Sequence, residues 1–169
     1  MKGISGEDDD RGIPGEETEA LFSEGNRLVT TGRYLEAIRV FDKALEAKPR
    51  EARYLTGLAA AVDRLGFFSH AMSLAGQATT AAPLSPDALF LQGLTAYRLG
   101  DYAGATRFFR EAISLLPEHA EAWFFLGNCH YLLGEKETSV GCFDRVLKIS
   151  GRYPKALYNK GVSLADLGR

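Results

Sequence analysis

Cysteine and histidine are the side chains of this chain with the most obvious potential for metal binding or catalysis. Cys129, His130 and Cys142 come closest to a metal cluster, but the adjacent Cys129 and His130 point to different sides of a helix, and a fourth ligand is absent. Nucleophilic catalysis would need a serine or cysteine as nucleophile beside a histidine as base, and no such pair recurs with the other histidines, His70 and His119. We therefore predict that the cysteines pack in a core, that the chain binds no metal or other cofactor, and that it is not an enzyme.

Glycine, which cradles phosphates when it clusters after a strand, is spaced here by a repeat instead. One series, 34 residues apart, is Gly32, Gly66, Gly100, Gly134 and Gly168. A second series at another phase of the same period is Gly25, Gly93, Gly127 and Gly161. The prolines Pro49, Pro83 and Pro117 keep the same step. A period of 34 residues indicates an array of stacked units.

Each unit divides into a helix, a short turn and a second helix. In residues 120–153, Trp123, Leu126 and His130 recur at helical spacing, Gly134 interrupts, and the spacing then resumes with Phe143. The turn glycine suits a left-handed helix cap, and the proline after each second helix stops it. We predict an all-α fold of stacked antiparallel helix pairs, with units at 18–51, 52–85, 86–119 and 120–153 and a half repeat at 154–169.

The two ends of the chain differ from the array. Residues 1–16 combine four glycines with the acidic run Glu7–Asp10, which predicts a flexible tail, with docking of the tail on its own array or on a neighbour's as the alternative. The repeat domain is then 17–169. Its last helix, 154–167, is expected to cap the apolar face of the fourth unit.

Composition excludes several classes of protein. The chain is 46% hydrophobic and 25% charged with a formal net charge of -2, so neither disorder nor a basic nucleic-acid surface is indicated. An apolar stretch of membrane-spanning length and an apolar signal core are both missing from the sequence. We predict a cytoplasmic protein with no nucleic-acid or membrane partner, and the two cysteines fit a reducing compartment.

The unit resembles the tetratricopeptide repeat (TPR). Residues 120–128 read A-E-A-W-F-F-L-G-N and residues 99–105 read L-G-D-Y-A-G-A, both close to the pattern of that family, and Pro117 closes the third copy. The resemblance covers residues 18–169. It implies an α-α superhelix, a right-handed solenoid of four TPR units and one terminal capping helix, and a role as a non-catalytic scaffold for protein-protein interaction.

In TPR proteins the first helices line a concave groove, faced by the second, fifth, sixth, ninth, twelfth and thirteenth places of each unit. Projection of these places gives Phe22, Ser23, Asn26, Val29, Arg53, Thr56, Gly57, Ala60, Asp63, Arg64, Phe90, Leu91, Leu94, Tyr97, Arg98, Phe124, Phe125, Asn128, Tyr131, Leu132, Lys155, Tyr158, Asn159 and Val162. The hypothetical peptide-binding groove comprises Phe22, Asn26, Thr56, Gly57, Ala60, Phe90, Leu91, Leu94, Tyr97, Phe124, Asn128, Tyr131, Tyr158 and Asn159.

Three expectations follow for this groove. Its apolar side chains, Phe124 among them, are surplus to packing and exposed, whereas Trp123 belongs to the core. Small residues of the second unit form a pocket for one partner side chain, which Gly57→Leu would fill. The amides of Asn128 and Asn159 hold the backbone of an extended peptide.

Recognition of a chaperone's C-terminal tail is disfavoured. The carboxylate clamp of chaperone-binding TPR domains needs Lys at the fifth place before the asparagine of the ninth, and Phe124 stands there in the unit that carries Asn128. The leading prediction is a module that holds an extended or helical peptide with an apolar component. The alternatives are a regulatory or targeting domain of a larger enzyme, and self-association through the array ends or the N-terminal tail.

Overall fold

The structure, a computed structural model, describes residues 15–169 and folds them entirely into helices and connecting turns. Within that range the helices are α1 (Gly15–Thr30), α2 (Tyr34–Ala47), α3 (Ala52–Arg64), α4 (Phe68–Ala81), α5 (Pro86–Arg98), α6 (Tyr102–Leu115), α7 (Ala120–Leu132), α8 (Lys136–Ser150) and α9 (Pro154–Asp166). The all-α prediction is confirmed. The helices α3, α5, α7 and α9 begin at the first residues of the predicted units.

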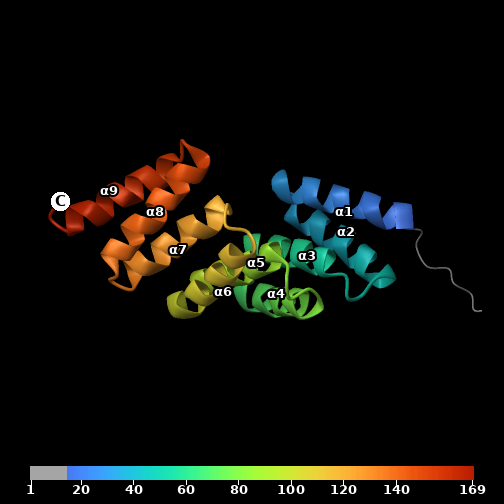
Figure 1. Cartoon of the computed structure of the whole chain (residues 1–169). Helices are drawn as coiled ribbons and strands as arrows, with labels where there is room; N and C mark the ends of the chain where they lie inside the picture. The colour runs from blue at the N-terminus through green and yellow to red at the C-terminus, as the bar shows by residue number, and fades with distance from the viewer. Residues whose placement is uncertain (1–14) are drawn as a thin grey trace, which may run out of the picture.

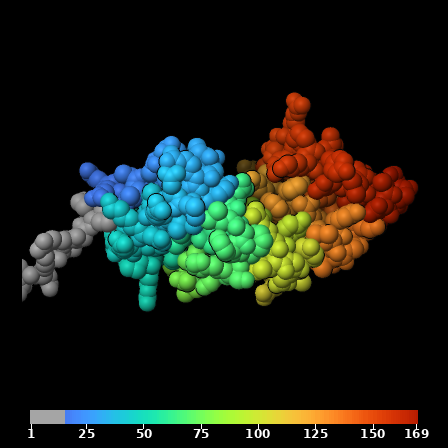
Figure 2. All heavy atoms as spheres, turned by 180° about the vertical axis from the view of Figure 1, so that it is seen from behind, coloured from blue at the N-terminus to red at the C-terminus, as the bar shows by residue number. Residues whose placement is uncertain are grey.

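The helices follow one another along a bent array, with α1 at one end and α9 at the other (Figure 1). Each helix packs against the next in sequence, and each first helix also contacts the first helix of the following unit. The two ends of the array rise on the same side, while α4 and α6 lie on the outer side of the bend (Figure 1). Seen from behind, the ends flank a depression over the middle units (Figure 2).

The turn glycines have the conformation that the period predicts. Gly32 has φ 79° and Gly66 φ 87°, in the left-handed region where a residue with a Cβ is strained, and the later turn glycines repeat this geometry. Pro86 and Pro154 open α5 and α9, where the missing amide donor removes no hydrogen bond.

The glycines within the first helices allow the two helices of a unit to approach closely. A Cβ added at Gly25 would lie 2.6 Å from the ring of Phe41, and Cβ atoms at Gly93 and Gly127 would lie 2.8 Å from the rings of Phe109 and Phe143. The second unit uses Ala59 and Ala75 at these two places, both fully buried. In three units the core therefore contains one phenylalanine ring packed against one glycine of the first helix. The second unit has two alanines at these places and lacks the ring.

Two predictions about the ends can be compared with the structure. Helix α1 begins at Gly15, and the boundary between tail and repeat domain at 16 and 17 stays a prediction. Most of the predicted tail, residues 1–14, lies outside the described residues. The last helix does cap the array, because Ala156 and Ser163 of α9 are buried and Ser163 Oγ lies 3.2 Å from Ser139 Oγ of α8.

The cysteines lie in the core, as predicted. Cys129 and Cys142 are buried with free thiols, and burial raises their pKa values to about 12 and about 11. The neighbouring His130 is also buried, with Nδ1 2.5 Å from Oε2 of Glu135. Across residues 15–169, no group of three His, Cys, Asp or Glu side chains is placed to hold a metal ion. None of the helices in that range is long and apolar enough to cross a membrane.

Candidate functional site

The first helices line three hollows on the inner side of the bend. The first, here the Phe22 hollow, measures about 470 Å³ and is lined by Phe22, Asn26, Glu51, Ala52, Arg53, Thr56, Gly57, Ala60, Ala82, Ser85 and Asp87. The arginine hollow measures about 390 Å³ and is lined by Val29, Thr30, Thr56, Ala60, Asp63, Arg64, Asp87, Phe90, Leu91, Leu94 and Arg98. The tyrosine hollow measures about 290 Å³ and is lined by Tyr97, Asn128, Tyr131, Leu132, Phe143, Tyr158, Asn159 and Val162.

The Phe22 hollow and the arginine hollow adjoin each other, since Thr56, Ala60 and Asp87 line both. The two hollows together are here called the channel across α1, α3 and α5. The helical spacing of Thr56 and Ala60 places both on the same face of α3.

Arg53 closes one side of the Phe22 hollow and is fully engaged. Its guanidinium lies 5.0 Å from the ring centres of Phe22 and Tyr54, and its Nη1 donates to Glu19 Oε2 at 2.8 Å. A second bond joins Nη2 to the same carboxylate. The hydrogen bonds from Arg53 lower the pKa of Glu19.

A buried ion pair supports the arginine hollow. Asp63 of α3 is only 1% exposed, and its Oδ2 lies 2.7 Å from Nη1 of Arg98 on α5. Thr95 Oγ1 also donates to Asp63 Oδ1 at 3.5 Å, and the Arg98 guanidinium stacks over Phe68 at 5.7 Å. Burial nevertheless raises the pKa of Asp63, because desolvation of the carboxylate outweighs the attraction of Arg98.

Arg64, on the rim of the same hollow, has a different environment. Its Nε donates to the hydroxyl of Tyr34 at 3.1 Å, and its guanidinium lies 5.5 Å from the centre of that ring. Within residues 15–169 it pairs with no carboxylate, although it is close enough to Asp63 to favour that side chain's charged form. Its two Nη groups remain available to a ligand.

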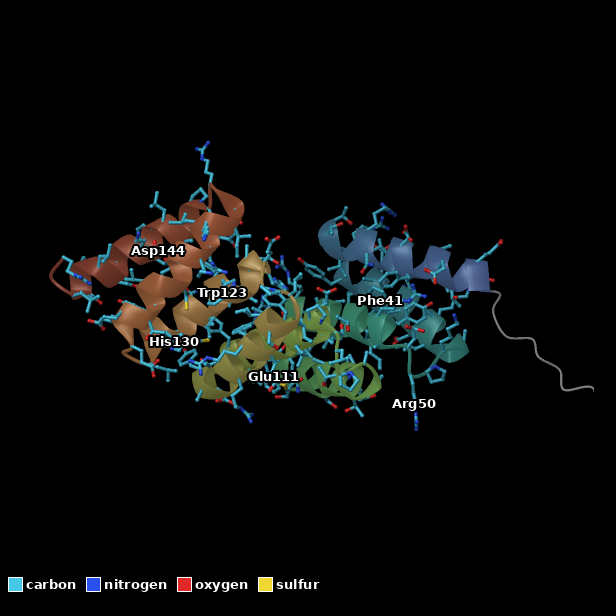
Figure 3. The ribbon with its side chains drawn as sticks, in the orientation of Figure 1. Phe41, Arg50, Glu111, Trp123, His130 and Asp144 are labelled. Atoms are coloured by element: carbon cyan, nitrogen blue, oxygen red, sulfur yellow. The ribbon has the colours of Figure 1, made fainter. Side chains whose placement is uncertain are left out.

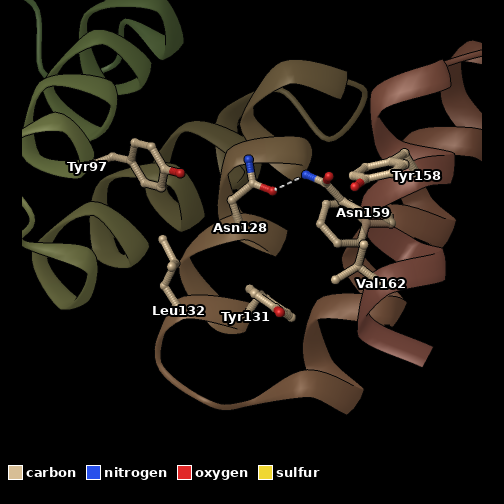
Figure 4. Close-up of a pocket in the computed structure, with 8 residues that line it drawn as sticks. Tyr97, Asn128, Tyr131, Leu132, Tyr158, Asn159 and Val162 are labelled. Atoms are coloured by element: carbon tan, nitrogen blue, oxygen red, sulfur yellow. Dashed lines mark hydrogen bonds between the residues drawn. The ribbon is translucent and has the colours of Figure 1, made fainter. Parts of the chain in front are cut away.

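Uncharged side chains line the tyrosine hollow. Asn159 Nδ2 of α9 donates to Asn128 Oδ1 of α7 at 2.8 Å, and this hydrogen bond joins the two helices (Figure 4). This bond leaves Asn128 Nδ2 and Asn159 Oδ1 without a partner among the described residues. Tyr131 donates to Asp166 Oδ2 at 2.9 Å, so one tyrosine is held in place at the wall.

An aromatic seam separates the arginine and tyrosine hollows. Phe125 of α7 packs 6.0 Å from Phe90, 6.0 Å from Phe109 and 5.5 Å from Tyr97, measured between ring centres. Both Phe90 and Tyr97 come from α5, and Phe90 lines the arginine hollow while Tyr97 lines the tyrosine hollow. Burial raises the pKa of the Tyr97 hydroxyl.

The structure brings most of the proposed groove residues together. Those that line a hollow are Phe22, Asn26, Thr56, Gly57, Ala60, Phe90, Leu91, Leu94, Tyr97, Asn128, Tyr131, Tyr158 and Asn159. Phe124 lines none of the three. Whether any of these residues contacts a ligand stays a prediction.

Two of the apolar side chains expected to be exposed are buried instead. Leu91 is 6% and Phe124 8% exposed. Phe124 packs against Phe143 at 5.9 Å and against Tyr153, from the turn before α9, at 5.3 Å. Trp123, assigned to the core, is only partly buried, and its Nε1 donates to the carbonyl oxygen of Pro117 at 2.9 Å. The exposure predicted for Phe124 is therefore wrong, whereas Trp123 packs against the core as predicted, with part of its ring left exposed.

The expected effect of Gly57→Leu also needs correction. The backbone of Gly57 lines the Phe22 hollow, but a Cβ at this position would lie 2.3 Å from the ring of Phe41. A leucine there would disrupt the contact between α2 and α3 instead of filling the groove. Ala60, whose side chain lines both adjoining hollows, is the position from which a larger side chain fills them.

The sequence projection missed some lining residues. Asp87 stands at the second place of the third unit, so the rule used for the other residues would have found it. Glu51, Ala82 and Ser85 come from the turns between units, to which a projection of first helices does not apply.

Comparison with protein families identifies the repeat. Two family models, both described as tetratricopeptide repeat, match the chain, one at residues 86–119 and 120–153 and the other at residues 22–66. Together they match well over half of the sequence. A search of curated proteins found no match.

Solved structures share the fold at low sequence identity. The MamA protein is 22% identical with a TM-score of 0.76, over 92% of this chain and 85% of that one. PilF of Pseudomonas aeruginosa is 20% identical with a TM-score of 0.84, over 89% and 69%. YrrB, described as a TPR protein with an unusual peptide-binding site, is 22% identical with a TM-score of 0.71, over 91% and 80%.

Proposed function

The chain belongs to the tetratricopeptide repeat family, and on this premise we propose that it is a non-catalytic interaction module that holds a peptide segment in its groove. The observation that carries the proposal is the set of hollows lined by the first helices. Their floors are apolar and their walls carry amide, hydroxyl and guanidinium groups, the combination that fixes a peptide's side chains and its backbone. The peptide-binding site of the similarly folded YrrB is consistent with this use of the fold.

Each hollow has a separate part in the proposed complex. The channel across α1, α3 and α5 takes an apolar side chain of the peptide over Ala60 and Leu94. In the tyrosine hollow, Asn128 Nδ2 donates to a peptide carbonyl and Asn159 Oδ1 accepts from a peptide amide. Because backbone groups are common to all peptides, the amide pair supplies affinity, and the channel supplies selectivity.

The test is a selection of random peptides on the purified chain, followed by titration of a synthetic selected peptide. Ala60→Leu fills the channel and is expected to weaken binding at least about tenfold, because the anchoring side chain loses its site. Val162→Trp is expected to obstruct the tyrosine hollow in the same way.

Ala103→Leu is the matched control, because Ala103 is an exposed residue of the second helix α6 and lines none of the three hollows. It should bind the peptide as the unmodified chain does. Failure to select any peptide, or equal affinities for Ala60→Leu and Ala103→Leu, would refute the groove as the binding site.

Self-association is a second candidate, favoured by the face of α9 that carries Leu157 and Gly161. Leu157 is 62% exposed, and a Cβ at Gly161 would meet no atom within 4 Å, unlike the equivalent glycines of α1, α5 and α7. A second copy that covers this face would bury Leu157. Sedimentation velocity at several concentrations should then show a dimer that Leu157→Lys abolishes, whereas a monomer at all concentrations contradicts it.

A further inference from the structure

We propose that the groove selects peptides in which a carboxylate side chain lies next to the apolar anchor, and that Arg64 binds this carboxylate. The inference rests on the proposed peptide-binding function and adds the chemistry of the partner. It depends on a difference among the three arginines that line the groove, Arg53, Arg64 and Arg98.

Two of these arginines are already neutralised by the chain itself. Arg53 binds Glu19 with both Nη groups, and Arg98 binds the buried Asp63 at 2.7 Å. A ligand carboxylate could reach either one only by displacing an internal partner. These two arginines therefore build the walls of the groove and leave the recognition of an acidic ligand to a third group.

Arg64 is oriented but not neutralised. The ring of Tyr34 supports its guanidinium, and the Tyr34 hydroxyl accepts from Nε, so the plane of the guanidinium is fixed on the rim of the arginine hollow. Both Nη groups are left for the two oxygens of a carboxylate, the paired geometry that arginine favours. Because the side chain is held in advance, binding a carboxylate loses less conformational entropy than it would with a free arginine.

The opposite end of the same hollow has the opposite charge. Asp87 lies in the first turn of α5, and Arg64 is the last residue of α3. First helices of successive units run in the same direction, so the two charges are separated by about 11 residues of helix, roughly 16 Å along the axes. An acidic peptide residue is attracted to the Arg64 end and repelled from the Asp87 end, which fixes the direction of the peptide across the apolar floor.

This carboxylate position differs from the chaperone-type clamp. Arg64 stands at the thirteenth place of the second unit, which that clamp does not use. The proposal assigns to this position a side-chain carboxylate within the peptide, the source that an Asp or Glu preference in the selected peptides would identify.

The experiment compares random-peptide selections on four versions of the 169-residue chain: unmodified, Arg64→Gln, Arg64→Glu and Arg50→Gln. Arg50 is the matched control because it is exposed and points away from the array, far from the inner side of the bend (Figure 3). Peptides from the unmodified chain should be enriched in Asp or Glu near an apolar residue. Arg64→Glu should replace that preference with Lys or Arg.

Titration of one selected acidic peptide gives the magnitude. Arg64→Gln should weaken binding about three- to tenfold, an effect that shrinks with added salt, and Arg50→Gln should leave affinity unchanged. Equal thermal unfolding midpoints of the variants would show that the fold is intact. Selected peptides with no acidic preference, or equal effects of Arg64→Gln and Arg50→Gln, would overturn the inference.

The two proposals fail in distinguishable ways. When Ala60→Leu weakens peptide binding but the acidic preference survives Arg64→Gln, the groove binds peptides and only the assignment of Arg64 is wrong. When Ala60→Leu has no effect, the groove itself is not the site, and the assignment falls with it.

Discussion

The arginine hollow and the tyrosine hollow occupy equivalent places in the repeat, yet different interactions hold them. In the first, α3 and α5 are joined by the ion pair of Asp63 and Arg98, with the carboxylate buried. In the second, α7 and α9 are joined by the neutral amide pair of Asn128 and Asn159. The side chains that line the arginine hollow therefore include charged groups, whereas those that line the tyrosine hollow do not. Next to the tyrosine hollow, Asp166 accepts from Tyr131 and pairs with Lys136 at 3.1 Å.

The difference shows how one backbone plan yields two kinds of binding surface. Burial of Asp63 has a desolvation cost that Arg98 only partly offsets, as the raised pKa of Asp63 indicates, so this pair contributes little net stability but defines the position of both side chains. The amide pair has a smaller desolvation cost and keeps a donor and an acceptor for a ligand. The repeat sets where the groove lies, and a few side chains set its chemistry.

The largest expected effect comes from the floor of the tyrosine hollow. Phe143 is fully buried against Gly127 and Phe124, so Phe143→Ala should lower the free energy of unfolding by about 3–5 kcal/mol. Because units of an array contact only their neighbours, hydrogen exchange should accelerate in α7–α9 and not in α1–α4. The half-buried Phe90 is the control, since Phe90→Ala should cost clearly less. Equal losses would contradict the difference in burial between the two rings, and faster exchange in α1–α4 would show that the two halves are not independent.

Arg98→Ala should destabilise the arginine hollow next most strongly. It leaves the Asp63 carboxylate buried without its partner, at a cost of about 2–3 kcal/mol in urea unfolding, below that of a fully buried pair because Arg98 is partly exposed. The double variant Asp63→Asn with Arg98→Ala should be more stable than Arg98→Ala alone, since it removes the orphaned charge. Strictly additive losses would mean that the two side chains are not coupled.

In the tyrosine hollow the corresponding substitution should have a smaller effect. Asn159→Ala removes one hydrogen bond between half-buried amides, at a cost of about 1 kcal/mol. The loss should be the same at every pH between about 4 and 8, because neither amide titrates. A loss that changes with pH across this range would contradict the description of the amide pair as independent of charge.

A pH titration gives the smallest and most selective contrast. Burial raises the pKa of Asp63 in the folded state, so this carboxyl binds its proton more tightly when folded than when unfolded. Its stabilising contribution is fully present below the unfolded value of about 3.9 and is lost as the pH rises through the folded pKa. The free energy of unfolding of the unmodified chain, minus that of Asp63→Asn, should therefore fall as the pH rises above the unfolded value. A difference that rises with pH would show that Arg98 dominates instead.

Much of the fold could be predicted because its signals are local. The glycines at 34-residue steps mark the turns, the prolines mark helix ends, and Gly25, Gly93 and Gly127 each face a phenylalanine 16 residues later. These features depend on φ angles and side-chain volumes within one unit. The first residues of α3, α5, α7 and α9 could therefore be predicted without knowledge of the contacts between units.

The errors in the groove arose where contacts beyond the first helix itself decide exposure. Phe124 is covered by Tyr153, from the turn at the end of the same unit, and by Phe143 of α8. Trp123 is partly exposed, and its Nε1 donates to the carbonyl oxygen of Pro117 at the end of the preceding unit. Gly57 was predicted to leave room for a ligand side chain, but the ring of Phe41, from the preceding unit, occupies the space next to its Cα.

The sequence by itself determined the period and the helix ends, because these follow from helical geometry and from residue size within about 34 positions, and its resemblance to the TPR family supplied the places that face the groove. Only the tertiary structure decided which rings are covered, that Asp63 is paired and buried, and that Arg64 is supported but not neutralised. Those properties depend on contacts between side chains of different helices, such as Arg98 with Asp63 and Asn159 with Asn128. Charge and exposure are set by what lies across the interface between helices, which no single helix encodes.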